Sequence, residues 1–108
     1  MRGWTVEVLA EAKAELADWP IEARASLTRI VERIEAVGLD RVGEPLLRHI
    51  EGKLWEMRAS GRKVEGRALY VTATGRRVVI VHAFQKTTRR TPRQAIELAT
   101  RRAKCLTP

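Results

Sequence analysis

The sequence predicts a small α+β domain, with a mainly antiparallel sheet of about four strands, two N-terminal helices and a C-terminal helix. The first observation is a run of three short segments rich in apolar and β-branched residues between residues 53 and 84, separated by turn-forming residues. Connections this short almost force neighbouring strands to run antiparallel. The second observation is the helical spacing of apolar residues on both sides of this region. A length of 108 residues suits one domain, so we expect residues 1–108 to form a single unit.

The N-terminal part of the chain predicts a strand followed by two helices. Residues 4–9, "WTVEVL", alternate in polarity as a half-buried strand does. The Ala, Glu and Lys content of residues 10–17 favours a short helix, which Pro20 ends. From Pro20 to Val37, apolar residues recur every three or four positions until Gly38. This spacing predicts a long helix with one apolar stripe against the sheet.

The remainder predicts a loop, three strands and a helix. Residues 39–52 are punctuated by Gly and Pro, so we expect a loop there, with at most one turn of helix at residues 46–50. The last expected strand is apolar on both alternations, which favours a central place in the sheet. Thr91 as N-cap and Pro92 as first residue then open a helix. We expect the helices on one face of the sheet. The strands are expected at residues 53–59, 66–73 and 77–84, with a tight turn at Thr74-Gly75.

The distribution of charge indicates an anionic partner. The formal net charge is +8 and the isoelectric point is near 10.8. Residues 1–57 hold 8 Lys/Arg and 11 Asp/Glu (net −3), whereas residues 58–108 hold 13 and 2 (net +11). A cationic field of this size concentrates anionic polymers around a protein. We therefore interpret the first half as scaffold and the second half as the working surface.

The sequence lacks the patterns of a metal, cofactor or membrane protein. The single cysteine, Cys105, cannot form an internal disulfide, and with His49 and His82 it makes no zinc-ligand spacing. A Ser/His/Asp set and a Gly-rich phosphate loop are also missing. Neither a signal-peptide pattern nor an apolar stretch near 18 residues occurs. We expect no metal or other cofactor, no membrane association and a reducing, cytoplasmic setting.

Cations gather near the ends of the expected strands. Arg58 ends one strand, Arg67 begins the next and Lys86 follows the third, so a meander brings them close together. Such groups repel one another unless a polyanion binds them, and phosphate is the obvious candidate. A single surface arginine is more often a solvated charge, but the imbalance of the whole set favours nucleic acid. The further candidate contacts are Arg62, Arg76 and Arg77 in turns, Arg89 and Arg90 after the third strand, and Arg93 and Arg101 on the last helix.

Few residues could handle protons at such a site. Tyr70 and His82 are candidates, although packing in the core or a structural hydrogen bond is the more common role for each. For Glu56 we prefer a salt bridge with an arginine on a neighbouring strand to a catalytic role.

Four motifs in register resemble the RelE/ParE superfamily of toxin-antitoxin toxins, in particular its HigB-like, phage-derived branch. They are "GKLWEMRA", "GRALYV", "VVIVHAFQK" and "TPRQAIELATRR". The resemblance implies a RelE-like, microbial-RNase-like fold and an mRNA interferase that cuts message on the translating ribosome and thereby inhibits translation. It also implies a cognate antitoxin, in this branch often a helix-turn-helix protein of the HigA type.

The resemblance also implies roles for individual residues. Arg67 matches the strand arginine that contacts the scissile phosphate, and Lys86 matches the basic residue that ends the last strand. Arg58, Tyr70 and Arg90 are weaker matches. One departure is Thr87, where the branch usually has a second lysine, and Arg89 or Arg90 would then substitute for it.

RNA cleavage needs a deprotonated 2′-hydroxyl, a stabilised phosphorane and a protonated 5′-oxygen. We expect Arg67 and Lys86 to flank the scissile phosphate, with Lys86 as base if neighbouring cations lower its pKa, and with Tyr70 or His82 as the alternative proton carrier. As rim charges, Arg67 and Lys86 should be replaceable by alanine without harm to the fold. Two other functions stay open: a ParE-like poison of DNA gyrase, and a basic nucleic-acid-binding module without chemistry.

Overall fold

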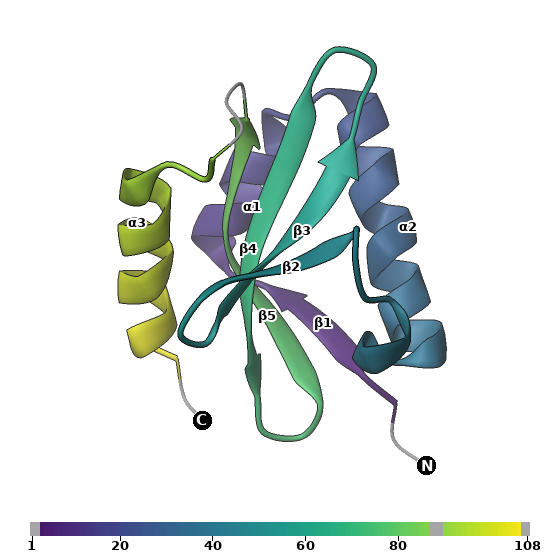
Figure 1. Ribbon diagram of the computed structural model, residues 1–108, viewed down its shortest axis with the longest axis vertical. Helices are drawn as coiled ribbons and strands as arrows, with labels where there is room; N and C mark the ends of the chain where they lie inside the picture. Colours follow the sequence, from purple (N-terminus) through teal and green to yellow (C-terminus); the bar gives the residue numbers. More distant parts are fainter. Residues whose placement is uncertain (1–2, 87–89, 107–108) are drawn as a thin grey trace.

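The computed structural model describes residues 3–86 and 90–106 and shows one five-stranded sheet with helices on both of its faces (Figure 1). The strand order is β1-β5-β4-β3-β2. The expected α+β class and antiparallel meander are confirmed, with five strands where about four were expected. The elements are β1 (Thr5–Val8), α1 (Ala10–Ala17), α2 (Ile21–Val37), a 3-10 turn η1 (Leu39–Arg41), β2 (Leu47–Glu51), β3 (Leu54–Ser60), β4 (Glu65–Ala73), β5 (Arg77–Lys86) and α3 (Arg93–Lys104).

The additional strand, β2, lies where the sequence predicts a loop, so the expected helical turn at residues 46–50 is wrong. β2 is an antiparallel edge strand that pairs with β3, with Leu47 opposite Met57 and Arg48 opposite Glu56. Leu47 is its one buried residue. A short edge strand of this kind carries almost no alternating pattern, because most of its side chains face water.

The helices cover both faces of the sheet, so the expectation that they share one face is wrong. Leu27 and Ile34 of α2 pack with Met57 of β3 in one core cluster, to which α1 contributes Ala12. Ile96 of α3 packs with Leu69 of β4 in a second cluster on the opposite face. β4 and β5 are buried on both alternations because each face is covered by helices.

β1, the outer neighbour of β5, pairs only with the first part of that strand. β1 pairs with β5 in parallel, from Thr5 opposite Arg77 to Val8 opposite Ile80, and the chain then leaves the sheet to form α1. On the other side β5 pairs with β4 along its length. β5 is therefore an inner strand, as expected, but from Val81 onward no strand of the described chain lies beside its outer edge.

A close approach of backbone and side chain fixes the segment between α1 and α2 to the sheet. A Cβ atom at Gly66 would overlap the ring of Trp19, so only glycine leaves room for the buried indole over β4. At the other end of α2, Gly38 has a φ of 96° and ends the helix where the sequence predicts. In the described ranges, no helix is long and apolar enough to cross a bilayer.

Candidate active site

Arg67 and Lys86 lie on the same face of the sheet. In the β4–β5 ladder, Arg67 is opposite Phe84 and Glu65 is opposite Lys86. Residues two apart in a strand share a face, so all four side chains lie on the side that α3 covers. Arg58 of β3 is opposite Arg67 and joins the same face. The structure therefore brings together Arg58, Arg67 and Lys86, as the strand ends suggested.

Arg67 is a buried residue between two carboxylates. Its side chain is 2% exposed; Nη1 donates to Oε1 of Glu56, and Nη2 donates to Oε2 of Glu65 at 2.7 Å. Glu56 is fully buried, and its other oxygen accepts a hydrogen bond from Oγ1 of Thr91 at 2.9 Å. The predicted ion pair of Glu56 with an arginine on a neighbouring strand is confirmed. The expectation that Arg67 is a rim charge is wrong, because its side chain is buried. Replacing it by alanine would harm the fold, since a buried carboxylate would be left unpaired.

The role expected of Thr91 is also different. Pro92 occupies the N-cap position of α3, and Thr91 makes no capping bond there. Its hydroxyl instead reaches Glu56 across the face of the sheet. This hydrogen bond attaches the start of α3 to the buried Glu56.

Lys86 is buried beside Arg67, so the expectation that it is a rim charge is also wrong. It is 6% exposed, and burial, followed by the nearby positive charge of Arg67, holds the pKa of its amine below the ordinary lysine value. The carboxylates of Glu56 and Glu65 act in the opposite direction and do not cancel this effect. A lysine with a lowered pKa gives up its proton more readily, which is the property a general base requires.

The side of the cluster that faces solvent is formed by partly exposed charges. The side chains of Arg58 and Glu65 are 34% and 46% exposed and lie 3.9 Å apart. The hydrogen bond from Arg67 holds the pKa of Glu65 below its usual value, although partial burial opposes this, so Glu65 is a carboxylate at neutral pH. The cluster thus has a buried part, formed by Glu56 and Arg67, and a partly exposed part of mixed charge, formed by Arg58 and Glu65.

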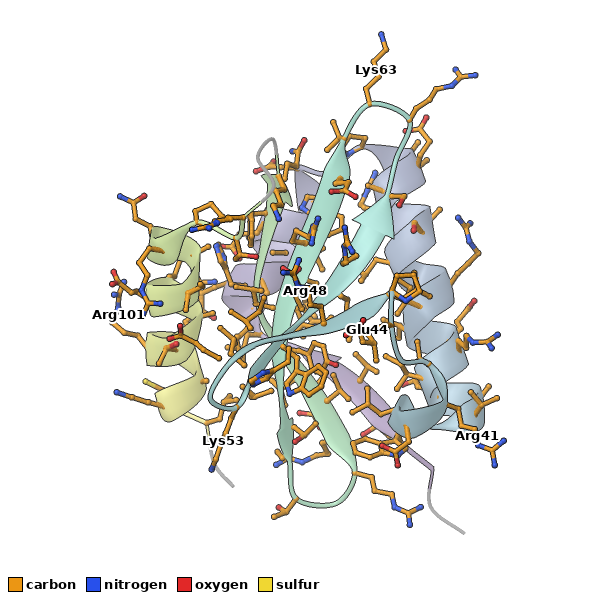
Figure 2. The ribbon with its side chains drawn as sticks, in the orientation of Figure 1. Arg41, Glu44, Arg48, Lys53, Lys63 and Arg101 are labelled. Atoms are coloured by element: carbon orange, nitrogen blue, oxygen red, sulfur yellow. The ribbon has the colours of Figure 1, made fainter. Side chains whose placement is uncertain are left out.

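Arg48 belongs to this face and was not among the candidates. It lies on β2 opposite Glu56, and its charge contributes to the lowered pKa of Lys86. Figure 2 shows its side chain on β2, in front of the neighbouring strands. No sequence pattern pointed to Arg48, because residues 39–52 were expected to form a loop.

The remaining candidate cations are spread over the molecule. Arg62 lies in the β3–β4 turn, at the top of Figure 1, while Arg76 and Arg77 lie at the β4–β5 turn at its bottom. Arg77 and Lys86 are the first and last residues of β5, so they are about 30 Å apart. Arg77 pairs with Glu7 at 3.3 Å. The structure therefore does not bring Arg76 or Arg77 to the Arg67 cluster.

The cations around α3 differ in their surroundings. Arg93 pairs with Glu51 at 2.7 Å and with Glu97 at 3.6 Å. Arg101 is exposed and projects from the outer side of α3 (Figure 2). Arg90 is exposed and directly precedes Thr91, which places its backbone near the site. Arg89 lies outside the described residues, as does Thr87.

Neither candidate proton carrier joins the cluster. Tyr70 is 1% exposed in the core beneath α2, on the opposite face of the sheet, and burial raises its phenol pKa. A tyrosine of this kind does not release a proton near neutral pH. His82 is 9% exposed, and its Nδ1 lies 2.9 Å from Oε1 of Glu15 while its ring stacks on Phe84. No group of three or more His, Cys, Asp or Glu suited to a metal ion occurs in the described part of the chain.

The chain is similar to a protein family and to solved structures. The model of a family described as "Phage derived protein Gp49-like" matches residues 14–104. Among solved structures, a chain from the crystal structure of the toxin-antitoxin complex RelBE2 of Mycobacterium tuberculosis is similar, with a TM-score of 0.56 and 23% identity, over 78% of this chain and 99% of that chain. No curated protein matches the chain. The structural similarity identifies a RelE-like fold.

Proposed function

The chain belongs to the Gp49-like family of phage-derived proteins, and on this basis we propose that it is the toxin of a type II toxin-antitoxin module, an endoribonuclease that cuts messenger RNA on the ribosome. The RelE-like fold, shared with a chain of a toxin-antitoxin complex, supports this assignment. Within that class we propose the HigB-like branch, because the four sequence motifs that resemble it fall on β3, β4, β5 and α3. The toxin would act in the cytoplasm as a single domain of residues 1–108.

The observation that carries the proposal is the shared face of Arg67 and Lys86. A cation that is hydrogen-bonded on both sides is held rigidly, and a rigid cation stabilises developing negative charge without reorganisation. Arg67 also has a buried Nε–H donor without a partner among residues 3–86 and 90–106. Its hydrogen bonding is thus incomplete in the free protein, which suits an arginine that binds phosphate.

In the proposed mechanism Lys86 and Arg67 have separate tasks. The lowered pKa of Lys86 makes a neutral amine available to accept the proton of the 2′-hydroxyl, and Arg67 stabilises the charge on the phosphorane. Glu65 holds Arg67 on the open side of the site. As the 2′-oxygen bonds to phosphorus the P–O5′ bond breaks, and the leaving 5′-oxygen would take its proton from water, because Tyr70 and His82 contact other groups. The site therefore offers little acid catalysis of its own. Dependence on the ribosome follows, since the ribosome would orient the message for in-line attack.

The other cations would contact RNA without taking part in chemistry. Arg58 lies on the partly exposed side of the cluster, and the exposed Arg62 and Arg101 lie on surfaces that could face ribosomal RNA. Replacing one of them should weaken ribosome binding only in part and should make the binding constant less dependent on salt concentration, because each neutralises about one phosphate. A complete loss of activity from a change at Arg62 or Arg101 would contradict this division of roles.

We also propose a cognate antitoxin of the helix-turn-helix, HigA-like type. Co-expression with the product of a neighbouring gene of this type should restore growth and yield a stable complex. Growth inhibition that no neighbouring gene product relieves would remove the chain from the toxin-antitoxin class.

The test is cleavage of a defined message by purified protein, with and without ribosomes. Cuts should appear only with ribosomes, be lost in Lys86→Met and persist in Lys13→Met, which removes an exposed cation from α1. Cleavage by Lys86→Met at the wild-type rate would refute the assigned chemistry. Gyrase-linked DNA breaks in cells without message cleavage would identify a ParE-like poison instead. Binding to RNA with neither effect would identify a non-catalytic module.

A further inference from the structure

A β-bulge in β5 decides which face of the sheet Lys86 occupies. Val79 lies on the α3 side of β5, and Ile80 lies on the α1 and α2 side. Val79 and Lys86 are seven positions apart, so in a regular strand they would point to opposite faces. The β4–β5 register shifts between Leu69 and Tyr70, which are opposite His82 and Ile80 and leave Val81 as an extra residue. This extra residue returns Lys86 to the face of Arg67.

The outer side of the backbone at the bulge has no neighbouring strand in the described chain. β1 ends at Val8, opposite Ile80, so from Val81 onward no strand among the described residues lies beside the outer edge of β5. Exposed or bulged edge groups need other partners, and a bulge without them can close by a one-residue slip. Here the partners are side chains of two helices from opposite faces of the sheet.

Glu15 of α1 and Arg102 of α3 meet at this edge and bind it together. Nη1 of Arg102 donates to the carbonyl oxygen of Val81 at 2.9 Å, and Oε1 of Glu15 accepts from the backbone N–H of Ala83 at 3.1 Å. The two side chains also pair with each other at 3.0 Å. The same carboxylate oxygen lies 2.9 Å from Nδ1 of His82. Both sides of the bulge are thereby held by charge-assisted hydrogen bonds, which are about twice as strong as neutral ones.

The ionisation of Glu15 suits this role. Burial alone would raise the pKa of its carboxyl group, but the hydrogen bonds from Arg102, His82 and the Ala83 backbone together lower it. Glu15 is therefore a carboxylate at neutral pH. Removing it would leave the backbone N–H of Ala83 and the guanidinium of Arg102 without this partner.

We propose that Glu15 and Arg102 are positioning residues, which hold the bulge at Val81 and His82 so that Lys86 lies beside Arg67. The effect on cleavage rests on the proposed function, whereas the placement of Lys86 does not. Loss of the clamp would let the strand slip, and the site would then lose its lysine. The residues act on the chemistry through backbone geometry.

The direct test is the titration of the Lys86 amine, followed by NMR of protein labelled at lysine Cε. In the wild type the amine should titrate below the ordinary lysine value. In Glu15→Ala and Arg102→Ala the value should rise toward that of an exposed lysine, and cleavage should fall by about 100-fold. Glu15→Gln keeps an oxygen acceptor for the backbone N–H of Ala83, so it should retain part of the lowered Lys86 pKa and part of the cleavage rate. Glu11→Ala, an exposed change on the same helix, should alter neither.

A deletion separates positioning from simple stability. Without His82, strand alternation alone places Lys86 on the Arg67 face, so adding Glu15→Ala to this deletion should change cleavage by less than about twofold. If the deletion does not fold, the titration of the single variants decides. An unchanged Lys86 titration in folded Glu15→Ala overturns the inference. If Lys86 responds but no variant or wild type cuts message, the proposed function fails and the positioning role stands.

Discussion

Replacing Arg67 by alanine should destabilise the protein strongly, and this expectation follows from its burial. Arg67 is 2% exposed and its partner Glu56 is 0% exposed. Removing one member of a buried pair leaves an uncompensated charge, which costs about 3–5 kcal/mol. The hydroxyl of Thr91 still donates to Glu56, so the carboxylate keeps one hydrogen bond. Against a total stability of roughly 5–15 kcal/mol, the loss is large.

The assay is urea denaturation of purified variants, with the free energy of unfolding taken from each curve. Arg58→Ala is the matched control, since Arg58 is the cross-strand neighbour of Arg67 but its side chain is 34% exposed. Its loss should be at most about 1 kcal/mol. The double change Glu56→Met with Arg67→Met should recover most of the stability, because neither member of the pair is then left buried without its partner. A loss below about 1 kcal/mol in Arg67→Ala would refute the buried-pair reasoning.

This result changes how activity data on Arg67 must be interpreted. Loss of growth inhibition in Arg67→Ala follows from unfolding as easily as from lost chemistry. Arg67→Lys keeps the positive charge beside Glu56 but lacks the planar fork that also reaches Glu65. If this variant is folded and inactive, Arg67 acts in the reaction and not only in the fold.

Three further outcomes are expected. Lys86→Met should raise the free energy of unfolding by about 1 kcal/mol at pH 7, because burial disfavours the charged amine. This gain should shrink as the pH rises toward the ordinary lysine pKa, above which the amine is neutral in both states. A loss of stability in urea denaturation would exclude burial as the main influence on the Lys86 pKa. Gly66→Ala should cost about 1–3 kcal/mol in thermal unfolding, since its Cβ would meet the ring of Trp19, and a neutral result would show that the indole does not pack there. The pKa of Glu15 is lowered on folding, so its contribution is present above pH 4.5, the unfolded value, and is lost as the pH falls through the lowered folded pKa. Unfolding midpoints between about pH 6 and 3 should therefore fall less steeply in Arg102→Ala, and an unchanged slope would contradict that pairing.

Much of the fold could be predicted because its signals are local. The antiparallel order of β3, β4 and β5 follows from connections too short for any other arrangement. The long helix α2 follows from apolar residues at helical spacing and ends at Gly38 as expected. The same short hairpins explain why Arg58, Arg67 and Lys86 were correctly expected to lie close together.

What could not be predicted depends on contacts between distant segments. β2 is a strand because β3 lies beside it, and its own side chains carry little pattern, which is why Arg48 was missed. The burial of Arg67 depends on Glu56 and on Thr91, 24 positions further along the chain. The covering of both sheet faces by helices was indicated in the sequence, since the last expected strand is apolar on both alternations.

The bulge shows a further limit of strand patterns. Alternation assigns each side chain to a face only while the strand is regular, and the extra residue in β5 changes the assignment for every position after it. The side chains that hold the bulge come from α1 and α3, 66 and 21 positions away from Val81. The order of the strand ends therefore predicted that Lys86 lies near Arg67. It did not predict the bulge that puts both side chains on one face of the sheet.

The most direct test of the central claim is the single-turnover rate of cleavage of messenger RNA bound in the ribosomal decoding site, measured across pH. The assignment of Lys86 as general base predicts a rate that rises as the Lys86 amine loses its proton, with a midpoint below the ordinary lysine pKa that matches the NMR titration of the same amine. A rate that is independent of pH over that range, or one that Lys86→Met leaves unchanged, would contradict it.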